Sequence, residues 1–263
     1  MPYRLASNAV WHSLPGVVSA YQPIGAPDAI AARQNIGLWQ RLLGSYTAAV
    51  GVAEWPVLFN SRAGWGTSTI GPRYIMTTIV PNAGWSALIR FSDVITNASF
   101  FGALTIVPAL AYFAIDCAGV GNRLRFLYGA SVYLSATAAI TSGVVGIAGS
   151  VGYKNGISDT ALGAFANINT TAMPISARSI DGTKGDYQTE NIQAFVVYSR
   201  TLTPAEGWLA SMQMAYCDVN PEWNAWAPRR RYWIAPAAGG AVGIYGRRHE
   251  LRIPGGVRIE ATK

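Results

Sequence analysis

The residues best suited to bind a ligand form an acidic cluster, Asp181, Asp186 and Glu190, in a glycine-rich stretch that also contains Lys184. Carboxylate oxygens in such a loop suit a Ca²⁺ ion or the hydroxyl groups of a sugar. The same composition is typical of a solvated surface turn. Both interpretations stay open on the sequence alone.

Aromatic rings are the second group that could contact a ligand, because flat rings stack on the faces of sugars. Trp65, flanked by glycines, and Trp85 are the rings that we expect to find exposed in loops. With Asp181 and Asp186 they form the candidate glycan-binding set. The alternative is that these large rings close the ends of a hydrophobic core.

Other chemistry has little support in the sequence. The two histidines, His12 and His249, lie near opposite ends of the chain, and there is no nucleophile elbow or phosphate-binding loop. The cysteines, Cys117 and Cys217, match neither a zinc site nor a disulfide framework, so we expect two buried thiols. We predict no catalytic residues, no enzymatic activity and no cofactor beyond a Ca²⁺ ion at the acidic cluster.

The net charge of +7 is concentrated near the C-terminus. Residues 1–227 carry 12 basic and 11 acidic groups, whereas residues 228–263 carry eight basic and two acidic groups. A solvated tail or a phosphate-binding arm would also fit, but interleaved aromatic residues favour docking onto a protein and make nucleic acid an unlikely partner. The predicted contact residues are Trp226, Arg229, Arg230, Arg231, Tyr232, Trp233, Tyr245, Arg247, Arg248, Arg252 and Arg258.

Short apolar or alternating runs bounded by Gly, Pro, Asn and Asp predict many antiparallel strands between residues 17 and 200. The apolar stretch Phe100–Ile115 contains Pro108, so we expect two buried strands there and no membrane span. The expected strands are Val17–Gln22, Val57–Phe59, Tyr74–Ile79, Ser86–Phe91, Phe101–Val107, Leu110–Asp116, Arg123–Tyr128, Val144–Tyr153, Ile175–Arg178 and Asn191–Tyr198.

Two local signals are stronger than the rest. Asn155-Gly156 predicts a type I′ turn and therefore a tight hairpin. Thr203, followed by a proline and by Glu206, predicts a capped helix that runs to about Cys217. We expect that helix to face the core through Leu209, Met212 and Tyr216. A helix over Asp28–Leu43 is predicted on weaker grounds, because Gly37 interrupts it.

Three stretches in this order resemble the laminin-G-like, concanavalin A-like lectin superfamily, and more narrowly its copies in bacteriophage virion proteins. They are residues 17–27, the hairpin around Asn155-Gly156, and Asn191 to Glu206 with its Tyr198-x-Arg200-x-Leu202 pattern. The resemblance implies an all-β, two-sheet antiparallel jelly-roll sandwich. We expect an N-terminal lead over residues 1–16, the sandwich over 17–217 and the basic aromatic arm over 218–263.

For function, the resemblance implies a place on a virion or the binding of glycan or protein. We predict a non-enzymatic capsid decoration or cement protein, a homo-oligomer such as a trimer, with capsid or tail subunits as partners. It would be made in the host cytoplasm without a signal peptide and displayed on the virion surface, away from membranes.

Two alternatives remain. The first is a receptor-recognition module of a tail or fibre that binds a cell-surface glycan. The second is a glycoside hydrolase, because the superfamily includes such enzymes. The E-x-D-x-x-E and E-x-D-x-E spacings that usually supply the paired carboxyl groups are absent from the chain.

Overall fold

The computed structural model describes residues 11–34, 36, 49–50, 58–66, 74–93, 98–118, 123–185, 191–217, 234–236 and 242–244. The chain divides into two compact units, Met1–Val219 and Asn220–Lys263. In the second unit β18 (Ile234–Pro236) pairs antiparallel with β19 (Val242–Ile244). All the contact residues predicted for the basic arm lie outside the described residues, and their role stays a prediction.

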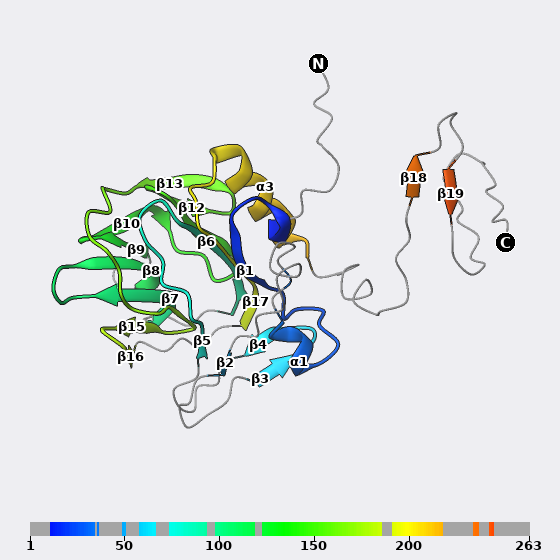
Figure 1. The fold of residues 1–263 in the computed structure, drawn as a ribbon, viewed down its shortest axis with the longest axis horizontal. Helices are drawn as coiled ribbons and strands as arrows, with labels where there is room; N and C mark the ends of the chain where they lie inside the picture. The colour runs from blue at the N-terminus through cyan, green and yellow to red at the C-terminus, as the bar shows by residue number, and fades with distance from the viewer. Residues whose placement is uncertain are drawn as a thin grey trace, which may run out of the picture. The chain divides into compact units, whose positions relative to one another are not determined.

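The first unit contains two β-sheets, which confirms the predicted all-β, two-sheet sandwich (Figure 1). One sheet has the strand order β13-β12-β11-β6-β17-β4-β3, and β1 also pairs with β17. Its strands are β1 (Val17–Tyr21), β3 (Leu58–Asn60), β4 (Gly64–Gly66), β6 (Ser86–Ser92), β11 (Gly143–Ala148), β12 (Val151–Lys154), β13 (Ile157–Ala161) and β17 (Asn191–Tyr198).

The second sheet has the order β10-β9-β8-β7-β14-β5-β2, and the hairpin β15–β16 joins it at β7. All its pairs are antiparallel except β15 with β7, which is parallel. Its strands are β2 (Ala49–Val50), β5 (Ile75–Met76), β7 (Ala98–Thr105), β8 (Ala111–Ala118), β9 (Arg123–Gly129), β10 (Ser131–Ala138), β14 (Pro174–Ile175), β15 (Arg178–Ile180) and β16 (Thr183–Gly185).

Aromatic rings from the facing strands form the core between the sheets. Phe91 of β6 lies 4.3 Å from Phe100 of β7, and Phe101 of β7 lies 5.6 Å from Phe195 of β17, measured between ring centroids. All four side chains are buried. Burial of this apolar area is the main free-energy gain on folding, and it holds one sheet against the other.

The predicted break at Pro108 is confirmed, since β7 ends before it and β8 begins after it. The single strand predicted over Val144–Tyr153 is wrong. Gly149, with a φ of 56°, turns the chain there and divides the segment into the hairpin β11–β12. The next hairpin, β12–β13, turns at Asn155 and Gly156 with φ values of 50° and 78°, as predicted.

Helix α3 (Pro204–Ala215) has the predicted capping box, in which Thr203 and Glu206 bond reciprocally. Its predicted core face is wrong, because Tyr216 is exposed and Leu209 and Met212 are half-buried. The buried positions are instead Gly207, Ala210, Ser211 and Met214. Gly207, Ala210 and Ser211 have small side chains, so α3 can lie close to the hairpin β12–β13 on this side. This side of the helix is therefore the one that is buried.

Two shorter helical segments lie near the start of the described chain. The 3₁₀ turn η1 (Trp11–Ser13) precedes β1, and α1 (Ala29–Ala32) follows it. Asp28 caps α1 by accepting two backbone hydrogen bonds, and Arg33 ends it. The prediction of one long helix from Asp28 is therefore wrong in length, and residues 37–48 lie outside the described residues. No helix among the described residues is long and apolar enough to cross a membrane.

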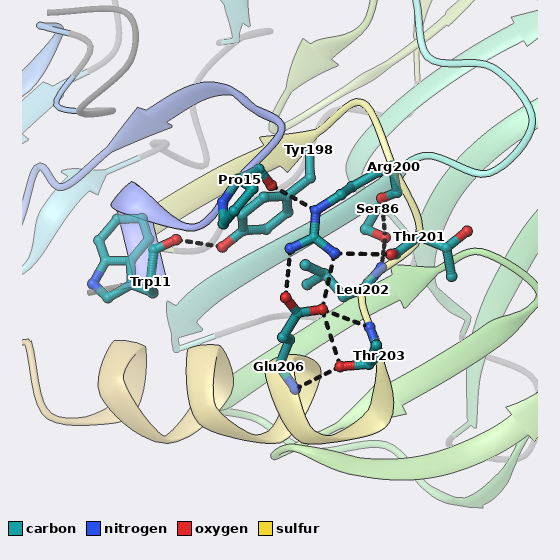
Figure 2. A network of polar contacts seen from close by, with 9 residues as sticks. All are labelled: Trp11, Pro15, Ser86, Tyr198, Arg200, Thr201, Leu202, Thr203 and Glu206. Atoms are coloured by element: carbon teal, nitrogen blue, oxygen red, sulfur yellow. Dashed lines mark hydrogen bonds and ion pairs between the residues drawn. The ribbon is translucent and has the colours of Figure 1, made fainter. Parts of the chain in front are cut away.

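A polar network joins the end of β17 to α3 and to the segment before β1 (Figure 2). Arg200 forms a bidentate ion pair with Glu206, at 2.6 Å and 2.9 Å, and its Nε donates to the Pro15 carbonyl at 2.6 Å. The buried Tyr198 hydroxyl donates to the carbonyl of Trp11. Hydrogen bonds from Arg200 lower the pKa of Glu206 to about 2.

We expect Glu206→Gln to lower the free energy of unfolding by about 1–2 kcal/mol at neutral pH, because the charged bidentate pair is lost. The side chains of Arg200 and Glu206 are 29% and 27% exposed, so solvent screens part of the interaction. The pKa of Glu206 is lower in the folded state, so its stabilisation is complete above pH ~4.5 and disappears as the pH falls towards 2.

Urea unfolding of both proteins across this pH range checks the expectation, and their difference should shrink as the pH falls. Thr203→Ala, which removes the cap hydroxyl but keeps both charges, should give a loss that depends less on pH. A constant difference between wild type and Glu206→Gln at every pH would contradict the ion-pair account.

Candidate functional site

The described residues form an open cavity of about 540 Å³ at one end of the second sheet. It lies where β5, β15 and the loops before β8 and β14 meet. This end of a sandwich is built from loops, which can vary without disturbing the sheets. The residues that line the cavity are Met76, Val107, Thr170, Thr171, Ala172, Ser179, Asp181 and Gly182.

Asp181 supplies the carboxylate of this cavity. It follows β15 in the turn to β16, with a φ of 45°, and its side chain is exposed. Its Oδ1 accepts a hydrogen bond from the Ile106 backbone N–H at 2.9 Å, and its own N–H donates to the Leu104 carbonyl at 2.9 Å. These two bonds hold the carboxylate in place, while Oδ2 has no protein partner within the described part of the chain.

A hydroxyl-rich loop forms the opposite wall. Buried Thr105 donates to Asn169 Oδ1 at 2.7 Å and accepts from the Thr170 N–H at 2.9 Å. The Thr171 N–H donates to the same Asn169 oxygen at 3.0 Å. The loop backbone is therefore fixed from inside, and the lining is preorganised rather than formed on binding.

Ser179 adds an unusual feature to the cavity. Its hydroxyl oxygen is buried and has no hydrogen-bond partner among the described residues. A buried polar atom without a partner costs free energy, roughly 1–3 kcal/mol. Such costs are tolerated where a ligand or a water molecule completes the bonding.

Apolar side chains lie beside these polar groups. Val107, which lines the cavity, is 71% exposed, and Ile106 is 44% exposed. Sugars present polar hydroxyl groups and apolar C–H faces together. Fixed hydrogen-bonding groups next to exposed apolar side chains match both properties.

The predicted site residues do not all lie at the cavity. Asp181 lies at the cavity, and Asp186 and Glu190 lie outside the described residues. Trp65 is 2% exposed in β4, with its ring 5.8 Å from that of Tyr21. A ring buried in this way cannot stack on a sugar, so the expectation of an exposed ring at this position is wrong. Trp85 is half-buried and does not line the cavity.

Metal-binding geometry is lacking in the part of the chain that the structure describes. No group of three His, Cys, Asp or Glu side chains there could hold a metal ion. His12 is buried, His249 lies outside the described residues, and the two cysteines are buried and form no disulfide. Of the three carboxylates in the predicted Ca²⁺ site, Asp181 alone lies among the described residues, so this site stays a prediction.

Sequence reasoning missed Val107, Thr170, Thr171 and Ser179. Val107 was assigned to the end of a buried strand, whereas it lies in the exposed loop between β7 and β8. Pro108 next to it was the available signal for a loop. No sequence signal marked Thr170, Thr171 and Ser179, because these residues come together only through contacts between distant segments.

No family model and no curated protein matches the chain by sequence. Among solved structures, the sialidase of Trypanosoma rangeli in complex with sialic acid matches with a TM-score of 0.51 and 12% identity. The same enzyme with 2,3-difluorosialic acid, described as a covalent intermediate, matches with a TM-score of 0.51 and 13% identity. The chain shares its fold with part of a sialidase. Each match covers 76% of this chain but only 34% or 32% of the sialidase.

This comparison supports the coarser part of the sequence resemblance, a lectin-like β-sandwich. It contradicts the predicted capsid decoration protein, and likewise the prediction of a protein without enzymatic activity, because the matched structures named above are sialidases. The predictions of a capsid decoration role and of a protein without enzymatic activity are therefore wrong. At such low identity the match establishes the fold, and what this chain does is a separate question.

The burial of Trp65 leads to a stability prediction. We expect Trp65→Ala to lower the free energy of unfolding by about 3–5 kcal/mol, since it leaves a cavity against Tyr21. Trp85→Ala, at a half-buried position, should cost clearly less. Urea unfolding of the two variants makes the comparison. Equal, small losses would show that Trp65 does not fill the core.

Proposed function

We propose that the chain binds carbohydrate through the cavity around Asp181, as a lectin-like sandwich module. The observation that carries this proposal is a carboxylate fixed by backbone hydrogen bonds inside an open, preorganised cavity with an exposed apolar rim. The fold shared with part of a sialidase supports it, because those proteins act on sugars.

The chemistry follows from the lining. Asp181 would accept hydrogen bonds from two neighbouring sugar hydroxyl groups, and charge-assisted bonds of this kind are stronger than neutral ones. The hydroxyl groups of Thr170, Thr171 and Ser179 can both donate and accept. Val107 would cover a C–H face of the ring, which contributes apolar burial.

Glycoside hydrolysis is the second candidate, and the sialidase matches favour it. Most glycosidases use two carboxyl groups, and sialidases use a tyrosine nucleophile. The described lining of the cavity contains one carboxylate and no tyrosine. We therefore place binding first and propose that any hydrolysis uses residues outside this lining.

The first experiment is a glycan-array screen of the full chain, followed by calorimetric titration of the best ligand. Asp181→Asn keeps an oxygen for the Ile106 N–H but removes the charge, so we expect at least a tenfold loss of affinity. The matched control is Asp93→Asn, at another exposed aspartate with positive φ that lies outside the cavity lining. Its affinity should equal that of the wild type.

Hydrolysis is measured on the same preparations with a fluorogenic α-sialoside. Binding without turnover supports a binding module. Turnover that survives Asp181→Asn supports a hydrolase site elsewhere in the chain. The proposal fails if no glycan binds, or if Asp181→Asn binds the ligand as tightly as Asp93→Asn does.

A further inference from the structure

The polar groups that the cavity around Asp181 leaves open are mainly hydrogen-bond acceptors. Asp181 is the one charged side chain of its described lining. Its Oδ1 already accepts from the Ile106 N–H, and its Oδ2 has no partner among the described residues. A cavity whose single charge is negative favours a ligand group that donates protons and carries positive charge.

The hydrogen-bond network of the threonine wall fixes the direction of each bond. Asn169 Nδ2 donates to the Ala103 carbonyl at 3.0 Å, so Oδ1 is the atom that faces Thr105. The Thr105 hydroxyl has one proton and donates it to this oxygen at 2.7 Å. In its contact with the Thr171 hydroxyl, at 3.2 Å, Thr105 must therefore accept and Thr171 must donate. Thr171 lines the cavity, so its oxygen then offers a ligand lone pairs and no proton.

Backbone donors beside the cavity are also bonded within the protein. The N–H groups of Ile106, Thr170, Thr171 and Asp181 each donate to a protein oxygen. A ligand carboxylate would find no cation in the described lining and would face the carboxylate of Asp181. Like charges at close range repel each other, so acidic sugars are disfavoured here.

Ser179 supplies a hydroxyl group that lacks a partner. Arg178, which pairs with Asp116 at 3.2 Å, and Ile180, which packs on an apolar cluster of β7, β8 and β9, share one face of β15. Side chains alternate along a strand, so Ser179 points to the opposite face, where it lines the cavity. Its Oγ is buried and has no hydrogen-bond partner among the described residues. A ligand that reaches this atom would satisfy it.

The approach to the carboxylate is open and lies in an acidic segment. Gly182 follows Asp181 in the turn, and a Cβ atom placed on it would meet no described atom within 4 Å. Residues 181–190 contain three acidic residues and one lysine, which gives a net charge of −2 by sequence. Electrostatic attraction therefore favours a cation over an anion at this end of the sandwich.

We propose that the cavity binds an amino sugar, whose protonated amine pairs with Oδ2 of Asp181. This inference rests on the proposed function, carbohydrate binding at the same cavity, and names its ligand class. An ammonium group has three donors and no acceptor, which matches the acceptors left open on Asp181 and Thr171. The Ser179 hydroxyl bonds a neighbouring sugar hydroxyl, and the exposed Val107 covers a C–H face of the ring. Neutral and N-acetylated sugars lack the charge and therefore gain no ion pair.

The test is titration of the full chain, followed by NMR, with glucosamine and galactosamine beside glucose, N-acetylglucosamine and glucuronic acid. We expect the amines to bind about tenfold more tightly than the uncharged sugars, because a charge-assisted bond replaces a neutral one, and glucuronic acid to bind least. As the pH rises through the pKa of the sugar's amine, affinity for the amines should fall to that for glucose. Affinity for glucose should stay constant over the same range.

Two variants assign the effect to residues of the cavity. Asparagine tolerates a positive φ, so Asp181→Asn should fold and lose the preference for the amines, whereas Asp93→Asn should keep it. Ser179→Ala removes an unpaired buried hydroxyl, so it should weaken binding of the amines severalfold without lowering thermal stability. A hydroxyl that serves only the fold would give the opposite pattern, a loss of stability with unchanged affinity. The pH profile of the wild type tests the proposal without any variant.

The proposal is overturned if the amines bind no more tightly than glucose, or if their affinity does not change with pH. It is also overturned if EDTA abolishes binding, since a Ca²⁺ ion would then meet the carboxylate, or if methylamine competes as strongly as glucosamine, since the cavity would then accept any amine. If glucose binds in a way that depends on Asp181 while the amines show no preference, the cavity binds carbohydrate and only this inference fails. If no glycan binds at all, both proposals fail.

Discussion

The aromatic core between the sheets is the interaction on which the rest of the structure depends, and outside that core the first sheet is fastened to its neighbouring segments by the ion pair between Arg200 and Glu206. This ion pair joins the end of β17, a strand within the first sheet, to the first turn of α3, and the same guanidinium holds the carbonyl of Pro15. The end of β17, the first turn of α3 and the segment before β1, which is distant in sequence, therefore meet at one side chain. Because β17 pairs with β1, β4 and β6, its position influences most of the first sheet.

The cavity proposed as the binding site relies on that rigid frame. The cavity takes its groups from loops whose backbone is held by internal hydrogen bonds, as the Asn169 side chain shows.

The sequence predicted what depends on neighbouring residues. Pro108, Asn155-Gly156 and the Thr203–Glu206 cap act within a few residues, so their turns and helix start could be predicted. The burial of Trp65 and the meeting of Asp116 with Arg178 depend on which strands pair, and no local pattern shows that. The virion role failed for another reason, since a sandwich fold serves many functions and does not select one.

The mixed pairing of β7 has a consequence for how the protein behaves in solution. On one side β7 pairs with β8, and on the other its residues bond first to β14 and then, in the parallel direction, to β15. An open edge beside Phe100 and Phe101 would offer unpaired N–H and C=O groups next to very apolar sequence, which is a template for aggregation. Two short consecutive strands, β14 and β15, cover that edge, so this part of β7 does not present it to another chain.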